Sequence, residues 1–113
     1  MFKRGSIYSA RLYPSKGQEV GKNRPVLVLQ TNLLNDISHT TVIILPLTTS
    51  LVENSYPLRL RIEVRENLKY TSEVLCDQIR AIDINRLDTE PIASLTQTEL
   101  LKLQEQIEII LDF

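Results

Sequence analysis

A chain of 113 residues with 42% hydrophobic and 24% charged residues has the composition of one globular domain, spanning residues 1–113. It holds no apolar run near the ~18 residues that a membrane span needs, and its basic N-terminus lacks the apolar core of a signal peptide. The net charge of −1 hides an uneven distribution, because residues 1–35 carry +5 and residues 36–113 carry −6. We therefore expect a cytoplasmic protein whose basic N-terminal third either binds a polyanion or forms only a solvated hairpin.

The N-terminal half predicts three strands. Gly5–Leu12 alternates well enough for a strand, and the polar, glycine-containing stretch Tyr13–Asn23 predicts a loop long enough to bind a ligand. Pro25–Gln30 is a short apolar run typical of a strand buried on both faces, in which the proline can occupy only the first position. After a connection with at most one helical turn, Thr40–Leu47 predicts a third strand. Its Pro46 indicates an edge or a bulge near the end of that strand.

Two further strands are predicted in the C-terminal half. Leu58–Val64 alternates strictly, which predicts four inward side chains (Leu58, Leu60, Ile62 and Val64) and an outer face with Arg59, Arg61 and Glu63. Val74–Ile82 is predicted as one strand, and the single cysteine, Cys76, is expected to be a buried, reduced hydrophobe within it. Asp83 is predicted to cap one helical turn, and Glu90–Leu95 to form a short connection or an edge strand.

The last predicted element is a helix. Thr96 and Glu99 have the spacing of a capping box, with Leu95 and Leu100 placed for a hydrophobic staple. One face at helical spacing is apolar, formed by Leu100, Leu103, Ile107, Ile110 and Leu111. Leu101 and Ile109 lie off that face, and this surplus of apolar surface predicts a homodimer. The predicted fold is α+β and mainly β: a small, strongly bent antiparallel sheet or barrel with a C-terminal helix.

The motifs that the sequence lacks exclude several classes of active site. His39 is the only histidine, and the sequence lacks zinc, P-loop and dinucleotide-binding motifs as well as the paired acids of a two-metal nuclease. We therefore expect no metal and no cofactor, which leaves arginine, hydroxyl groups and scattered carboxylates. Arg24 stands directly before Pro25 and the apolar run. There it could clamp a phosphate with its planar fork, or simply cap a strand.

Four segments of the sequence carry recognisable motifs. GQEVGKNRPVLVLQ at Gly17–Gln30 has a run of Gly-x-Glu followed by Arg-Pro and hydrophobic residues. RGSIYSARL at Arg4–Leu12 is the first predicted strand, and TTVIILPLTTS at Thr40–Ser50 is a strand that ends in a threonine. SEVLCDQIRAIDINRL at Ser72–Leu87 contains an acidic-Gln-Ile-Arg motif. All four resemble, in the expected order, segments of the MazF/PemK family of bacterial toxins, and together they cover nearly the whole chain.

The resemblance implies a metal-independent endoribonuclease that cuts single-stranded RNA by attack of the substrate's own 2′-hydroxyl. Such chemistry leaves a 2′,3′-cyclic phosphate and a 5′-hydroxyl. The implied fold is an SH3-like barrel with a C-terminal helix, working as a homodimer with an RNA groove. An antitoxin with an acidic C-terminal segment would occupy that groove as a phosphate mimic, and the basic N-terminal third gives the mimicry a physical basis.

The same resemblance assigns residues. Arg24 matches the family's catalytic arginine, Thr48 its catalytic threonine and Glu19 its loop glutamate. Gln78 and Arg80 match its Gln-Ile-Arg motif, and no metal ligand is expected. The residues that we expect to bind RNA are Lys16, Gln18, Lys22, Asn23, Thr49, Ser50, Gln78 and Arg80. The hydroxyls of Thr49 and Ser50 are close enough in sequence for a one-residue error of register. Gln78 and Arg80 could equally form a polar network that supports the sheet.

The sequence departs from the family pattern in one loop, and two alternative functions remain open. Val20-Gly21-Lys22-Asn23 replaces a more glycine-rich stretch of the family, which predicts a stiffer loop and leaves the cleaved RNA sequence open. The related CcdB toxins share the fold, bind DNA gyrase and cut nothing, and a degenerate member could bind RNA or a partner without cleaving it. The Arg-Pro pair and the threonine that ends the Thr40–Leu47 strand favour the nuclease, because a gyrase binder needs neither.

Overall fold

The structure is a computed structural model that describes residues 2–12 and 23–113. Its strands are β1 (Ser6–Arg11), β2 (Asn23–Val28), β3 (Thr41–Thr48), β4 (Arg59–Ile62), β5 (Ser72–Leu75), β6 (Arg80–Asp83) and β7 (Leu87–Ser94). Its helices are α1 (Asn32–Asn35), the single 3-10 turn η1 (Ile84–Arg86) and α2 (Gln97–Leu111). None of the helices in these described ranges is both long and apolar enough to cross a membrane.

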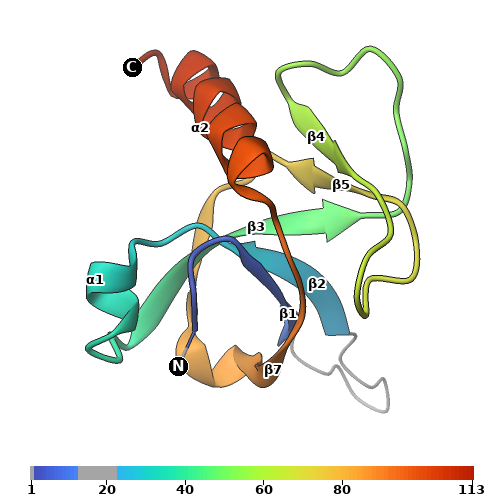
Figure 1. Cartoon of the computed structure of the whole chain (residues 1–113). Helices are drawn as coiled ribbons and strands as arrows, with labels where there is room; N and C mark the ends of the chain where they lie inside the picture. The colour runs from blue at the N-terminus through green and yellow to red at the C-terminus, as the bar shows by residue number, and fades with distance from the viewer. Residues whose placement is uncertain (1, 13–22) are drawn as a thin grey trace, which may run out of the picture.

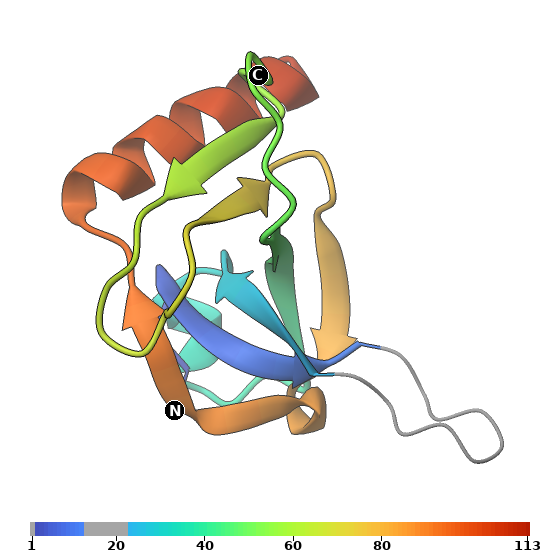
Figure 2. The same ribbon diagram turned by 90° about the vertical axis from the view of Figure 1, so that its right-hand side faces the viewer.

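The strands form an antiparallel sheet in the order β4-β5-β3-β2-β1-β7, and β6 also pairs with β3. The sheet curves strongly, and α2 packs on the side where β4 lies (Figures 1 and 2). This architecture confirms the predicted class, a bent antiparallel sheet with a C-terminal helix. The single turn of α1, the turn capped by Asp83 and the edge position of β7 are confirmed as well.

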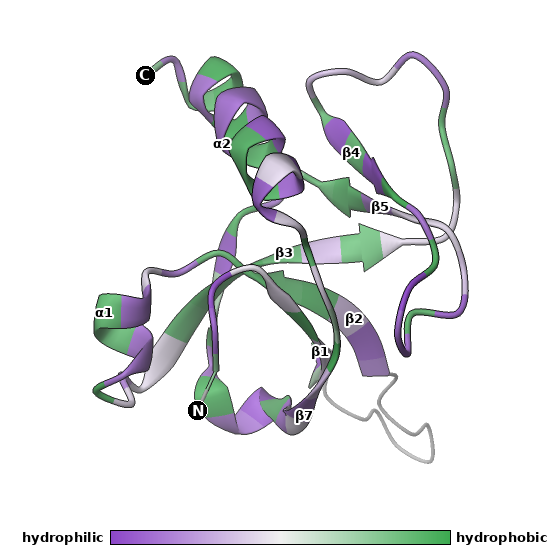
Figure 3. Cartoon of the chain, in the orientation of Figure 1, coloured by the Kyte–Doolittle hydropathy of each residue, from purple (hydrophilic) through white to green (hydrophobic). Residues whose placement is uncertain are grey.

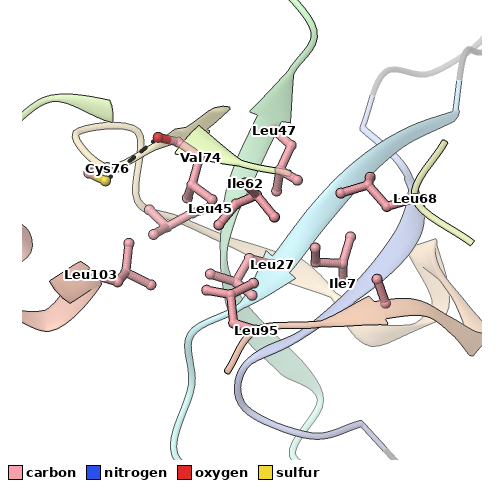
Figure 4. Packing of buried hydrophobic residues seen from close by; sticks show 11 residues of the cluster. Ile7, Leu27, Leu45, Leu47, Ile62, Leu68, Val74, Cys76, Leu95 and Leu103 are labelled. Atoms are coloured by element: carbon pink, nitrogen blue, oxygen red, sulfur yellow. Dashed lines mark hydrogen bonds between the residues drawn. The ribbon is translucent and has the colours of Figure 1, made fainter. Parts of the chain in front are cut away.

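Buried side chains form two clusters, one on each face of the central strands. Leu27 belongs to the cluster that packs under α2, whereas Val26 and Val28 belong to the other. The prediction that this apolar run is buried on both faces is therefore confirmed. Figure 4 shows the first cluster, with Leu103 of α2 directed toward the strands. Cys76 is buried in this cluster, and burial raises the pKa of its thiol to about 12.

Helix α2 begins with the predicted capping box. The Thr96 hydroxyl accepts a hydrogen bond from the Glu99 backbone N–H at 3.2 Å, and the Glu99 carboxylate accepts one from the Thr96 N–H at 2.8 Å. Polar and apolar residues alternate around the helix in Figure 3, as expected for one buried face. Leu103 is fully buried on that face, and Leu100, Ile107 and Ile110 pack against the same cluster, but Leu111 near the C-terminus is exposed.

The position of Pro25 was predicted wrongly. It is the third residue of β2 and pairs with Ser9 of β1, instead of opening the strand. The Gly5 N–H donates to the Val28 carbonyl and the Leu29 N–H to the Ile43 carbonyl, so odd-numbered residues of β2 direct their N–H groups toward β3. Pairing with β3 begins only at Val26, so the strand loses no ladder hydrogen bond at the proline.

The stretch Val74–Ile82 is not one strand. It divides into β5 and β6, joined by a turn in which the Gln78 N–H donates to the Leu75 carbonyl at 3.1 Å. The cause lies in β3, which pairs with β6 as far as Ile44 and with β5 from Leu47 onward. Pro46 lies where β3 changes its partner from β6 to β5. It pairs with β2 on one side and with neither β5 nor β6 on the other, so it does not lie at an outer edge of the sheet.

Strand β4 is also shorter than predicted. Leu58 and Val64 were expected inside, but they are 47% and 56% exposed and lie beyond the ends of the strand. Ile62 is fully buried, as predicted. Gln106 of α2, which sequence analysis did not single out, lies buried against this segment and donates to the carbonyls of Pro57 and Arg59 at 2.9 Å each. It thereby ties the helix to the start of β4.

A close approach of α2 to the N-terminal segment depends on Gly5. Its φ of +89° is a conformation that side chains with a Cβ rarely adopt. A Cβ at this position would also lie 2.8 Å from a terminal carbon of Leu100. The Leu95 N–H donates to the Gly5 carbonyl at 2.9 Å, so the glycine fixes where the chain enters α2.

Candidate active site

A pocket of about 180 Å³ opens where β2, β3 and the turn between β5 and β6 meet. Its lining is apolar at Leu12, Pro46, Leu47 and Leu75 and polar at Arg24, Thr48, Gln78 and Arg80. The described residues that line it include two arginines and no carboxylate. Four polar groups from distant parts of the sequence therefore converge on one site that favours an anion.

Arg24 reaches the pocket from the second position of β2. Its backbone lies opposite Ala10 of β1, and the next residues are Pro25, which fixes φ, and the fully buried Val26. The side chain itself is exposed. The local sequence thus holds the backbone still and leaves the guanidinium at the surface of the pocket.

Thr48 is the last residue of β3 and is half-buried. Its hydroxyl oxygen accepts a hydrogen bond from the Ser50 N–H at 3.1 Å, which leaves the hydroxyl proton available as a donor. Thr49 and Ser50 are exposed and do not line the pocket. Of the three neighbouring hydroxyls, the structure brings only that of Thr48 to Arg24.

Gln78 and Arg80 come from the region where β5 gives way to β6. Gln78 lies in the turn, and Arg80 is the first residue of β6, paired with Ile44 of β3. Both side chains are exposed and line the pocket. A hydrogen-bonded polar network at the same end of the sheet is centred on Glu73.

Glu73 of β5 is a residue that sequence analysis missed. Its side chain is 3% exposed, and its carboxylate accepts hydrogen bonds from the Val52 N–H at 2.9 Å, from Arg59 at 3.0 Å and from Arg61 at 3.0 and 3.2 Å. Burial opposes ionisation, but these donors outweigh it and hold the pKa of Glu73 below its usual range. The strict alternation in β4 predicts that Arg59 and Arg61 share one face of the strand. No pattern in the nearby sequence indicates that Glu73 is their partner.

The remaining predicted residues divide into two groups. Asn23 is the first residue of β2, exposed and opposite Arg11, and it does not line the pocket. Lys16, Gln18, Glu19 and Lys22 lie outside the described residues. Across residues 2–12 and 23–113, no three side chains of His, Cys, Asp or Glu gather as a metal site would require.

A larger hollow of about 500 Å³ lies at the C-terminal end of α2. It is lined by Tyr56, Glu105, Glu108, Ile109, Asp112 and Phe113. Three of these residues are acids and none is a cation, so this hollow would repel a phosphate. We therefore place the candidate site in the smaller pocket.

The sequence matches the model of PemK-like, MazF-like toxins of type II toxin–antitoxin systems over residues 3–111. It is 36% identical over 110 residues to the endoribonuclease EndoA of Bacillus subtilis (strain 168), covering 96% of this chain and 93% of the relative. It is 32% identical over 112 residues to the endoribonuclease MazF of Staphylococcus epidermidis, covering 98% and 92%.

Solved structures agree with these relatives. The toxin MazF-mt6 of Mycobacterium tuberculosis aligns with a TM-score of 0.79 and 25% identity over 96% of this chain and 97% of its own. An endoribonuclease of a mycobacterial species, solved in complex with its cognate antitoxin, aligns with a TM-score of 0.77 and 19% identity over 100% and 97%. The second likeness concerns the fold alone.

Proposed function

Because this chain belongs to the PemK-like, MazF-like toxins of type II toxin–antitoxin systems, we propose that it cuts single-stranded RNA through the ribose 2′-hydroxyl. The chain is an endoribonuclease of that family. The observation that supports the proposed chemistry is the convergence of Arg24, Thr48, Gln78 and Arg80 on one pocket. Two cations and two neutral hydrogen-bonding groups suit a phosphodiester with an adjacent base.

In the proposed reaction, the 2′-oxygen bonds to phosphorus as the bond from phosphorus to the 5′-oxygen breaks. The 2′-hydroxyl loses its proton and the departing 5′-oxygen gains one, which leaves a 2′,3′-cyclic phosphate and a 5′-hydroxyl. The nucleophile belongs to the substrate, so the protein has to position the phosphate and stabilise its growing negative charge.

Each residue of the pocket has a proposed part. The guanidinium of Arg24 contacts the non-bridging phosphate oxygens, where charge develops, and the Thr48 hydroxyl donates a hydrogen bond to the same group. Gln78 and Arg80 bind the flanking nucleotide. Four residues outside the described ranges have proposed roles that rest on sequence alone. Glu19 is proposed as a catalytic residue, and Lys16, Gln18 and Lys22 are proposed to contact RNA. Asn23, Thr49 and Ser50 are proposed to contact RNA outside the pocket.

We also propose two protein partners, a second copy of this chain and an antitoxin with an acidic C-terminal segment. A structural relative was solved with its cognate antitoxin. The exposed side chains of Arg24 and Arg80 offer such a segment the charge that they would offer RNA. An antitoxin bound in this way would inhibit by occupying the site.

A single digest tests the proposed chemistry. A long single-stranded RNA is incubated with the protein in excess EDTA, and the new ends are tested for cyclic phosphate and free 5′-hydroxyl groups. We expect cleavage at discrete sites, unaffected by the chelator. Loss of cleavage with EDTA and its return with magnesium would overturn the mechanism. Intact RNA beside inhibited supercoiling by DNA gyrase would instead favour the CcdB-like alternative.

A further inference from the structure

A buried ionic network lies next to Thr48, one of the residues that line the pocket. Glu73 is the partner of Thr48 across β3 and β5, and of Arg61 across β5 and β4, so the three residues form one row across three strands. An ionised side chain as buried as Glu73 is stable only when its oxygens are fully paired, and here four donors bond to them. The same donors lower the pKa of its carboxyl group.

The network reaches Thr48 through one residue, Ser50. The Ser50 N–H donates to the Thr48 hydroxyl oxygen at 3.1 Å, and the Ser50 carbonyl accepts from Arg59 at 2.8 Å. The same terminal nitrogen of Arg59 donates to Glu73 at 3.0 Å. Two residues further on, the Val52 N–H donates to the same oxygen of Glu73. The segment that follows β3 is therefore held at two points, by Arg59 of β4 at Ser50 and by Glu73 of β5 at Val52.

We propose that Glu73 and Arg59 are positioning residues for Thr48, an inference that rests on the proposed function. They fix Ser50, and Ser50 sets the direction in which the Thr48 hydroxyl presents its proton. Neither of them lines the pocket, so they act on the reaction through Thr48 rather than on the RNA. Because a small misplacement of a reacting group lowers the rate steeply, loosening this segment should reduce cleavage more than RNA binding.

Strand β4 supplies a matched pair of variants. Arg59 and Arg61 lie two residues apart, and both donate to Glu73. Only Arg59 also bonds to Ser50, whereas Arg61 bonds to Glu53 at 2.8 Å. Arg59→Gln and Arg61→Gln each remove one positive charge from the same strand. Arg61 makes two bonds to Glu73 and Arg59 only one, so a slower Arg59→Gln reports the contact with Ser50 and not a weaker pairing of Glu73.

The substrate is a short oligoribonucleotide that spans a site mapped on the long RNA. Single-turnover cleavage is measured over a range of enzyme concentrations, which separates the maximal rate from half-saturation. Binding is measured with the same oligonucleotide carrying a 2′-deoxy residue at the cleaved position. We expect Arg59→Gln to cut about tenfold more slowly than Arg61→Gln at saturation, with equal affinity for the deoxy analogue.

Equal maximal rates of the two variants, or a slower rate explained by weaker binding alone, would overturn the proposal. Glu73→Gln is a second test, in which a maximal rate equal to that of the wild type would also overturn it. If Glu73→Gln does not fold, as judged by circular dichroism, the arginine pair decides alone. The wild type and Arg24→Ala serve as controls for the proposed function. If the wild type leaves RNA intact, that function fails and this inference fails with it.

Discussion

Arg24 combines a backbone held still with an exposed cationic side chain, and this combination defines the first prediction. Arg24→Ala should lower the single-turnover rate by about 10²–10³, the usual cost of losing a group that stabilises transition-state charge. Arg24→Lys should recover little, because an ammonium group does not reproduce the paired contacts of a guanidinium. The circular dichroism spectrum should not change, since the side chain is exposed. A folded Arg24→Ala that cuts at the wild-type rate would make Arg24 only a strand cap.

Thr48 and Thr49 are adjacent and have the same side chain, so their alanine variants test which of the two hydroxyls is catalytic. Only Thr48 lines the pocket, so Thr48→Ala should reduce cleavage at least tenfold and Thr49→Ala should leave it within about twofold. Both rates are measured on the mapped oligonucleotide at saturating enzyme. The reverse order of effects would show that the catalytic hydroxyl has been assigned one residue too early.

The residues of this site differ in how far the sequence could reveal them. Arg24 was visible because Pro25 and the apolar run make its position unusual within a few residues. Its convergence with Thr48 and Arg80 could come only from the family resemblance, because the three lie on different strands. Glu73 could not be found at all. Its partners lie 12 to 21 residues away along the chain, and a buried acid leaves no local pattern.

Among the elements, those stabilised by local contacts were predicted best. The capping box of α2 depends on residues three apart, and the turn after Asp83 on residues two apart. The division of Val74–Ile82 depends on how β3 divides its pairing between β5 and β6, which no local pattern reports. The exposure of Leu58 and Val64 has a similar cause, because pairing with β5 limits β4 to four residues.

The start of α2 also defines a prediction about pH. Arg65 donates hydrogen bonds to both oxygens of the Glu99 carboxylate, and this pairing, together with the Thr96 N–H, holds the pKa of Glu99 below its usual range. A lowered folded-state pKa stabilises the fold above the unfolded-state value of about 4.3. That stability is lost as the pH falls through the folded-state pKa.

Glu99→Gln should therefore reduce the free energy of unfolding by about 1–2 kcal/mol at pH 7. The difference from the wild type should shrink as the pH falls below the unfolded-state value and through the lowered folded-state pKa of Glu99, because the wild-type carboxylate itself becomes protonated there. Urea denaturation at pH 7 and at pH 3.5 measures both values. Asp88→Asn, at an exposed position of β7 outside both pockets, is the control and should change little at either pH. A deficit of Glu99→Gln that stays constant with pH would exclude the ionised pair as its source.

At the scale of the whole molecule, the sheet and helix leave apolar side chains uncovered. Leu101 and Ile109 lie off the buried face of α2, as the sequence predicts, and they are 53% and 54% exposed. Tyr56 and Phe113 are exposed beside Ile109, around the hollow at the end of the helix. Single exposed apolar residues are common on monomers, but several gathered on one region are typical of an interface.

We therefore predict that the protein is a homodimer at micromolar concentrations. Light scattering should give twice the mass of the 13.0 kDa chain, and the melting temperature should rise with protein concentration, because dimerisation stabilises the folded state by mass action. Ile109→Lys and Leu101→Lys test whether this face of α2 forms the interface, since a buried unpaired charge there would shift the chain to the monomer. Lys102→Glu is the matched surface control, exposed on the same helix, and should remain dimeric. A wild type that stays monomeric at tens of micromolar would contradict the prediction, and the exposed side chains would then need another partner.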